Sequence, residues 1–279
     1  MGADLPFSDA ARAVLALALF ATGAADAQRS APPPPLQPVF AENFDSADSL
    51  DRVRALRSRH VTVVDGRGIG GSRALRVTYV GGAEGSSRIV AKVPIPPALD
   101  YTLTYAVRFD RDFQFVLGGK LHGLGSRMPV AGGEPIRPDG WSARVMWREH
   151  GRAETYIYHQ DQPGRYGDAG TAIRPFRFTR GRYYAVAFHV RLNQPATQAN
   201  GLVELHIDNH LIERRDGLRL RSVDTPDSLI STFLFSTFHG GNDPSWAPRT
   251  KNGGYADVHA TFDDFAVYPG PYFSLPAPR

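Results

Sequence analysis

Short segments in which apolar and polar side chains alternate recur along this chain, and they constrain its fold more than any other feature. Three of them lie close together: FQFVLGGKLH (113–122), GWSARVMWR (140–148) and ETYIYHQ (154–160). Because successive side chains of a strand point to opposite faces, such alternation predicts β-strands. Loops rich in Gly and Pro separate the segments, as a sheet of neighbouring antiparallel strands requires. Long helical periodicity is absent, so the sequence predicts one all-β domain.

Strand parity divides the side chains of this stretch between two faces. The predicted polar face carries Gln114, Lys120, His122, Ser142, Arg144, Arg148, Tyr156, Tyr158 and Gln160. The opposite face carries Phe113, Phe115, Leu117, Leu121, Trp141, Val145, Trp147 and Ile157. The stretch therefore predicts a polar patch on a sheet, above an apolar underside.

Further strands are predicted on both sides of this stretch. They are an opening strand with a short helix capped by Asp45 or Ser46 (38–53), two strands around the turn GIGGS (60–80), and strands within 101–110, 181–193, 228–241 and 261–270. GLVELHIDNHLIERR (201–215) predicts a hairpin that turns at Asp208-Asn209. We expect the first and last strands to lie near one another.

The predicted strand within 181–193 has a second face that is either a groove for a sugar chain or a solvated outer face. This face carries Ala185, Ala187, His189 and Arg191.

Six motifs follow one another over most of residues 100–270: GGKLHGL, GWSARVMWR, TYIYHQDQPGRYG, VRLNQ, STFHGGNDPSWAP and FDDFAVYPG. In sequence and order they resemble polysaccharide lyase family 14, whose members are β-jelly-roll enzymes that cleave alginate or glucuronan by β-elimination. The resemblance implies a β-jelly-roll sandwich of two antiparallel sheets with a concave substrate-binding face. It places the family's catalytic residues on Lys120, Ser142, Arg144, Tyr156 and Tyr158. His122, where proline is usual, and His239, where an aromatic residue is expected, depart from the family pattern.

Elimination from a polyuronate removes the proton next to the carboxylate and expels the glycosidic oxygen from the adjacent carbon. The intermediate places a second negative charge beside the first, so cations and hydrogen-bond donors must neutralise the carboxylate. Arg144 can bind a carboxylate as a fork, Lys120 adds a point charge, and Ser142 donates a hydrogen bond. We expect Tyr156 and Tyr158 to divide proton abstraction and leaving-group protonation. The nearby cations are expected to lower the pKa of the tyrosines, so that activity rises above neutral pH.

Further polar side chains are candidate substrate-binding groups. They are Gln114, His122, Arg148, Gln160, His189, Arg191 and His239.

Two other functions stay open at this point. A noncatalytic carbohydrate-binding jelly roll would use the same aromatic and basic face without depending on Lys120 or on a tyrosine hydroxyl. A jelly-roll glycoside hydrolase needs two carboxylates that flank the bond, and the nearest pair, Glu204 and Asp208, has the wrong spacing.

His206 and His210 are spaced like a zinc pair, but they fall in a predicted hairpin rather than on a helix. We expect no catalytic metal and no required cofactor; a structural Ca²⁺ held by loop aspartates stays open.

The N-terminal residues 1–27 end in AVLALALFATGAADA, a short apolar run with a small-x-small cleavage pattern, and predict a signal peptide. An ordinary N-terminal helix is the alternative. Residues 28–38, QRSAPPPPLQP, predict an extended spacer, and residues 39–279 a single jelly-roll lyase domain. Removal of residues 1–27 leaves 31 basic and 25 acidic side chains, a net charge of +6 that suits an anionic substrate.

The chain contains no cysteine, so its stability depends on burial of its core. We expect a secreted or periplasmic monomer that binds an anionic polysaccharide or oligosaccharide, with no nucleic-acid partner and no stable membrane insertion. The preference among mannuronate, guluronate and glucuronate, and the choice between endo and exo cleavage, stay open.

Overall fold

The computed structural model describes residues 36–276 of the chain. The predicted signal peptide (1–27) and residues 28–35 of the predicted spacer lie outside the described residues. The α-helix α1 spans Ser49–Arg52. Short 3₁₀ helices lie at Arg54–Leu56, Ile69–Gly71, Glu149–Gly151, Pro226–Ser228 and Pro244–Trp246.

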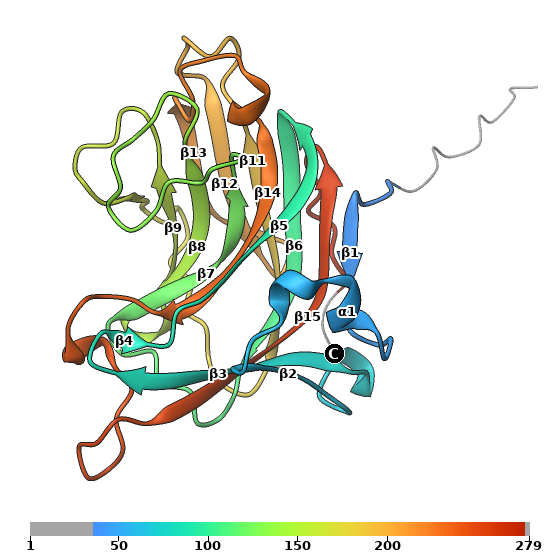
Figure 1. The fold of residues 1–279 in the computed structure, drawn as a ribbon, viewed down its shortest axis with the longest axis vertical. Helices are drawn as coiled ribbons and strands as arrows, with labels where there is room; N and C mark the ends of the chain where they lie inside the picture. The colour runs from blue at the N-terminus through green and yellow to red at the C-terminus, as the bar shows by residue number, and fades with distance from the viewer. Residues whose placement is uncertain (1–35, 277–279) are drawn as a thin grey trace, which may run out of the picture. The chain divides into compact units, whose positions relative to one another are not determined.

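Two antiparallel sheets form a sandwich, as the sequence predicts (Figure 1). The larger sheet runs in the order β13 (His210–Leu218), β12 (Gly201–Ile207), β11 (Tyr183–Arg191), β6 (Asp100–Phe109), β15 (Asp257–Pro269), β3 (Ala74–Gly82) and β2 (Val61–Val64). Two short strands join it, β1 (Phe40–Glu42) beside β15 and β4 (Gly85–Ser86) beside β3. The smaller sheet runs in the order β10 (Asp168–Ala169), β9 (Ala153–Tyr158), β8 (Ser142–Arg148), β7 (Gly118–Gly125), β14 (Ile230–His239) and β5 (Ile89–Ala98).

The first and last strands lie together, as expected for this kind of sandwich. Strand β1, blue in Figure 1, pairs antiparallel with β15, red in the same view. The predicted hairpin is also confirmed: β12 and β13 are joined at Asp208 and Asn209, both with positive φ, which the tight turn between two strands requires.

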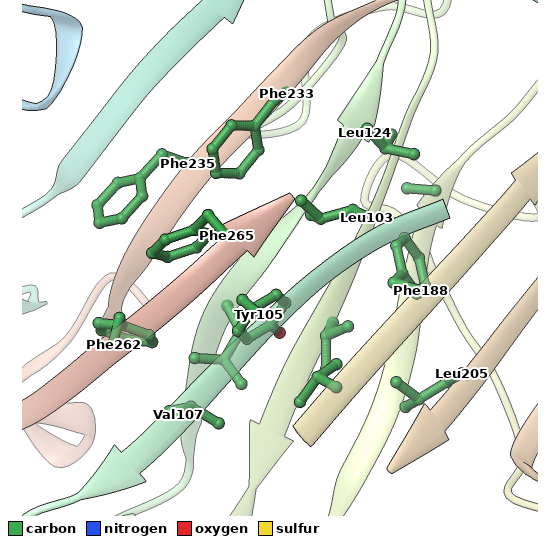
Figure 2. Packing of buried hydrophobic residues seen from close by; sticks show 14 of the residues in the cluster. Leu103, Tyr105, Val107, Leu124, Phe188, Leu205, Phe233, Phe235, Phe262 and Phe265 are labelled. Carbon is green, nitrogen blue, oxygen red and sulfur yellow. The ribbon is translucent and has the colours of Figure 1, made fainter. Parts of the chain in front are cut away.

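The core between the sheets is built from alternate residues of the strands on both sides. Figure 2 shows its centre, to which six strands contribute Leu103, Tyr105, Val107, Leu124, Phe188, Leu205, Phe233, Phe235, Phe262 and Phe265. Trp141, Val145, Trp147 and Ile157 are also fully buried there, as their parity predicts. Because these apolar residues occupy the inner face of β8 and β9, the residues between them must face outward.

Two predictions about secondary structure were wrong, and one strand was missed. The strand expected over 113–122 begins only at Gly118, because residues 113–117 form the loop before β7. Helix α1 has Asp48 as its N-cap, and the carboxylate of Asp45 instead accepts a hydrogen bond from the backbone of Arg73 at 3.0 Å. Strand β5 was not predicted; it contains three prolines, which are tolerated because it lies at the edge of its sheet.

His122 does not lie on the polar face with Lys120, and this prediction was wrong. A register shift between Lys120 and Gly123 adds one residue to β7 relative to its neighbour β8, so strict alternation ends there. His122 is fully buried, with its ring stacked on Phe235 at 4.3 Å and edge-on to Tyr105 at 4.9 Å. Its Nδ1 accepts the backbone N–H of Ser236 at 3.2 Å, while Nε2 has no hydrogen-bond partner within residues 36–276.

We predict that His122 makes the protein sensitive to acid. Burial lowers the pKa of His122 well below its ordinary value, whereas the unfolded chain binds this proton at about pH 6.5. Stability is therefore complete above that pH and is lost below it, by up to about 1.4 kcal/mol per pH unit for one histidine. His122→Phe should flatten this dependence in urea unfolding curves compared between about pH 7.5 and about pH 5.5.

The exposed Met128 supplies the control, since Met128→Leu changes no titratable group and should leave the dependence on pH unchanged. Equal slopes for the wild type and His122→Phe would contradict the prediction.

Candidate active site

The outward face of β7, β8 and β9 carries a compact group of cationic and phenolic side chains. Lys120 comes from β7, Ser142, Arg144 and Arg148 from β8, and Tyr156 and Tyr158 from β9. The pairing between β8 and β9 aligns Ser142 with Tyr158, and Arg144 with Tyr156. Strand register thus brings the five residues implied by the family resemblance, together with Arg148, onto one face.

The side chain of Lys120 extends from β7 across β8 to the Tyr156 ring of β9. Its Nζ is 3.1 Å from the Sδ of Met146 and 3.8 Å from the centre of the Tyr156 ring. Burial, followed by repulsion from Arg144, Arg148 and Arg88, lowers the pKa of Lys120 well below its ordinary value. The amine is therefore easier to deprotonate than an exposed lysine.

Arg144 is almost completely buried, with 4% of its surface exposed. Its guanidinium carbon is 6.0 Å from the ring centre of Tyr156 and 5.9 Å from that of Tyr158. Its Nε has no hydrogen-bond partner among the described residues. A buried donor without a partner is costly, so this guanidinium is suited to receive an acceptor from a bound molecule.

The backbones of β7 and β8 approach so closely beside Arg144 that only glycine fits at the facing position of β7. Gly123 is the register partner of Arg144, and a Cβ at Gly123 would come within 1.9 Å of the carbonyl oxygen of Ala143.

The tyrosine pair packs edge to face, with ring centres 5.7 Å apart and an angle of 81° between the rings. Burial, reinforced by Tyr158, raises the pKa of Tyr156 above its ordinary value, and Arg144 and Arg148 oppose this only in part. The expectation that the cations lower the pKa of Tyr156 was wrong, because the loss of hydration outweighs their attraction.

Two loops cover the tyrosines. From the loop between β7 and β8, the carbonyl of Val130 accepts a hydrogen bond from Ser142 Oγ at 2.6 Å, and the N–H of Gly133 donates to the Tyr158 hydroxyl at 3.0 Å. From the loop between β9 and β10, Gly167 lies so close that a Cβ would be 2.7 Å from the Tyr156 ring. Tyr158 is consequently 1% exposed.

Glu154 is a residue of this face that the sequence analysis did not select. It shares the parity of Tyr156 and Tyr158 on β9, which is the signal that could have identified it. Its carboxylate forms ion pairs with Arg148 Nε and, at 2.8 Å, with Arg152 Nη1. Arg148 is thereby held with its guanidinium carbon 5.9 Å from the centre of the Tyr156 ring.

The strand with both tyrosines is also fixed from its inner side. Glu213 of β13 is buried, and one of its carboxylate oxygens accepts the N–H of Thr155 at 2.9 Å. This bond joins β9 of the smaller sheet to β13, the edge strand of the larger sheet, beside the site.

Three predicted substrate-binding residues bind the protein's own backbone. The amide of Gln114 donates to the carbonyl of Arg249 at 2.8 Å, and that of Gln160 to the carbonyl of Leu220 at 3.2 Å. His239 is fully buried with its ring stacked on Phe113 at 5.2 Å, and burial lowers its pKa to about 4. His239, a candidate substrate-binding residue, therefore packs in the aromatic core and does not lie on the outward face.

His189 and Arg191 do not join the outward face of β7 to β9. Their strand, β11, belongs to the larger sheet, and its apolar alternate residues face the core. The polar side of β11 therefore faces away from Lys120 and the two tyrosines, so His189 and Arg191 are not part of this site. His189 instead contacts Asp100 at 2.7 Å and Glu204 at 3.2 Å.

No helix within residues 36–276 is long and apolar enough to cross a membrane. In the same part of the chain, no group of three or more His, Asp or Glu side chains is placed to hold a metal ion.

Solved structures with this fold include several polysaccharide-cleaving lyases. The alginate lyase Aly36B is 21% identical, with a TM-score of 0.69 over 84% of this chain and 99% of that chain. The alginate lyase from Aplysia kurodai is 21% identical, with a TM-score of 0.63 over 84% and 99%. The endo-β-1,4-glucuronan lyase from the fungus Trichoderma reesei is 16% identical, with a TM-score of 0.57 over 84% and 96%. At sequence identities this low, the similarity to these structures shows a shared fold.

The sequence gives the family. The model of polysaccharide lyase 14 matches residues 71–265, which include all strands of the site. The chain therefore belongs to polysaccharide lyase family 14, as its motifs indicate. Among proteins with curated functions, no significant match was found.

We predict that Tyr158→Phe destabilises the protein, because it leaves the buried N–H of Gly133 without an acceptor. The expected loss is about 1–3 kcal/mol in urea unfolding. Tyr166→Phe is the control: Tyr166 lies in the neighbouring loop, is 51% exposed, and should change stability by less than about 0.5 kcal/mol. Equal effects of the two substitutions would mean that the loop does not cover Tyr158 in solution.

Proposed function

We propose that this lyase cleaves alginate or glucuronan by β-elimination on the outward face of β7, β8 and β9. The observation that supports this most is the grouping of Lys120, Arg144 and Arg148 around two tyrosines on one face. The substrate class is supported by the alginate and glucuronan lyases that share the fold. It is also supported by variants of Aly36B that were solved in complex with alginate tri- and tetrasaccharides.

The chemistry of this face fits the charge requirement of the reaction. Removal of the proton beside a uronate carboxylate places new negative charge on that group, and preorganised donors in a dry site stabilise it most effectively. In our proposal Arg144 binds this carboxylate, because its Nε is buried without a partner. Ser142 adds a hydroxyl on the same strand, once its bond to the carbonyl of Val130 is exchanged for the substrate.

The pKa directions suggest how the proton-transfer roles are divided. A base must be deprotonated near the working pH and an acid must retain its proton. Because the pKa of Lys120 is lowered and that of Tyr156 is raised, we assign proton abstraction to Lys120 and protonation of the leaving oxygen to Tyr156. Tyr158, bonded to the loop through Gly133, positions the other ring.

We predict that the full chain, mixed with alginate or glucuronan, increases the ultraviolet absorbance of the solution, since elimination creates an unsaturated uronate and hydrolysis does not. Lys120→Ala and Tyr156→Phe should each reduce the rate by about 10²-fold or more. Arg127→Ala removes an exposed cation that pairs with Asp227, and it should retain full activity. Binding of the polymers without any rise in absorbance would instead support a noncatalytic carbohydrate-binding module.

We predict a second difference, which separates a lysine base from a tyrosine base. With Lys120 as base, kcat/KM rises with pH and levels off below the ordinary lysine pKa of about 10.4. Lys120→Arg should then be as inactive as Lys120→Ala, because a guanidinium stays protonated to above about pH 12. If kcat/KM still rises beyond about pH 10 and Lys120→Arg is active, the base is a tyrosine and Lys120 supplies only charge.

A further inference from the structure

The outward face contains a buried carboxylate, that of Glu154. A negative charge repels an anionic substrate, so this carboxylate requires a structural or electrostatic explanation. The side chain of Glu154 is 3% exposed, and its two oxygens bind Arg148 and Arg152. A buried charge requires partners of opposite sign, and both partners here are cations of the site's own rim. Glu154 therefore neutralises positive charge that would otherwise attract the substrate.

Register places Glu154 in line with Lys120. Lys120 is paired with Met146 across β7 and β8, and Met146 is paired with Glu154 across β8 and β9. The three residues form one row across the sheet, and Lys120 contacts Met146. Since neighbouring strands are about 4.8 Å apart, the amine and the carboxylate face the same side at a separation where charges interact.

The charges around Lys120 are unbalanced. The groups that act on it are Arg144 and Arg148 of β8, Arg88 from the segment before β5, and Glu154 of β9; the Tyr156 ring lies against its amine. Three of these groups are cations that disfavour the protonated amine, and Glu154 is the anion among them. Its negative charge therefore opposes the effect of the arginines and favours the protonated form of Lys120.

Glu154 also separates the roles of the two arginines. Arg148 donates its Nε to Glu154, so this nitrogen is already bound. In the part of the chain that the structure describes, the Nε of Arg144 has no such partner. Glu154 therefore occupies the Nε of Arg148, whereas the Nε of the buried Arg144 stays available to bind substrate.

We propose that Glu154 is a positioning residue, whose buried carboxylate holds Arg148 beside Tyr156 and sets the charge balance around Lys120. The effect on catalysis rests on the proposed function, in which Lys120 is the base. The effect on the protonation of Lys120 does not depend on that function and can be measured without substrate.

The chain suits a direct measurement, because its lysines are only Lys92, Lys120 and Lys251. In protein labelled with ¹³C-lysine, the signal of the carbon beside the amine reports protonation, and loss of one signal in Lys120→Arg assigns it. Glu154→Gln should lower the titration midpoint of Lys120, because the anion that favours the protonated amine is removed. Glu149→Gln, at an exposed site five residues away, should leave it unchanged. An unchanged midpoint in Glu154→Gln would overturn the proposal.

Kinetics test the consequence for the reaction. The rising limb of kcat/KM against pH should move to lower pH in Glu154→Gln by the same amount as the NMR midpoint, and Glu154→Asp, which keeps the charge, should restore it. A uniform loss of kcat/KM without a shift of the limb would overturn the role in catalysis. If the wild type cleaves no polyuronate, the proposed function fails, whereas the NMR titration still decides the proposal on Glu154.

A variant at the exposed partner avoids disturbing the buried group, should Glu154→Gln fail to fold. Arg152→Gln leaves the charge of Glu154 less neutralised, so the midpoint of Lys120 should rise. A midpoint that stays at the wild-type value in this folded variant would overturn the proposal.

Discussion

The site depends on burial of aromatic and aliphatic side chains between the two sheets. Trp141, Val145, Trp147 and Ile157 fill the inner face of β8 and β9, and the alternation of a pleated strand sends their neighbours to the other side. A slip by one residue would exchange the two faces and place Arg144 and both tyrosines in the core. Burial of the apolar set therefore fixes the register, and the register assembles the polar face.

Loss of hydration then gives this face its chemical character. In water, cations beside a tyrosine would favour the phenolate, but here burial of Tyr156 outweighs them and raises its pKa. The same burial, with the surrounding guanidinium groups, lowers the pKa of Lys120. The charged forms of both groups are disfavoured together. Glu154 limits this effect on Lys120, which makes a carboxylate useful within a site for an anionic polymer.

The covering loops connect stability with the chemistry of the site. Val130 and Gly133 bind the hydroxyl groups of Ser142 and Tyr158 through the backbone, and Gly167 rests against both tyrosine rings. These contacts satisfy polar groups that would otherwise be buried without partners, and they exclude water from the tyrosine pair. A sugar chain that reaches Ser142 must replace the bond to Val130 with one of its own.

The sequence by itself determined the all-β sandwich, its family, and the shared face of Ser142, Arg144, Tyr156 and Tyr158, because strand parity and family motifs are local properties of the chain. The tertiary structure decided the rest. It turned His122 inward through a register shift, and it placed His189 and Arg191 on the other sheet. It also reversed the pKa direction expected for Tyr156. Bulges, the assignment of strands to sheets, and hydration all depend on contacts between distant segments, which no local pattern records.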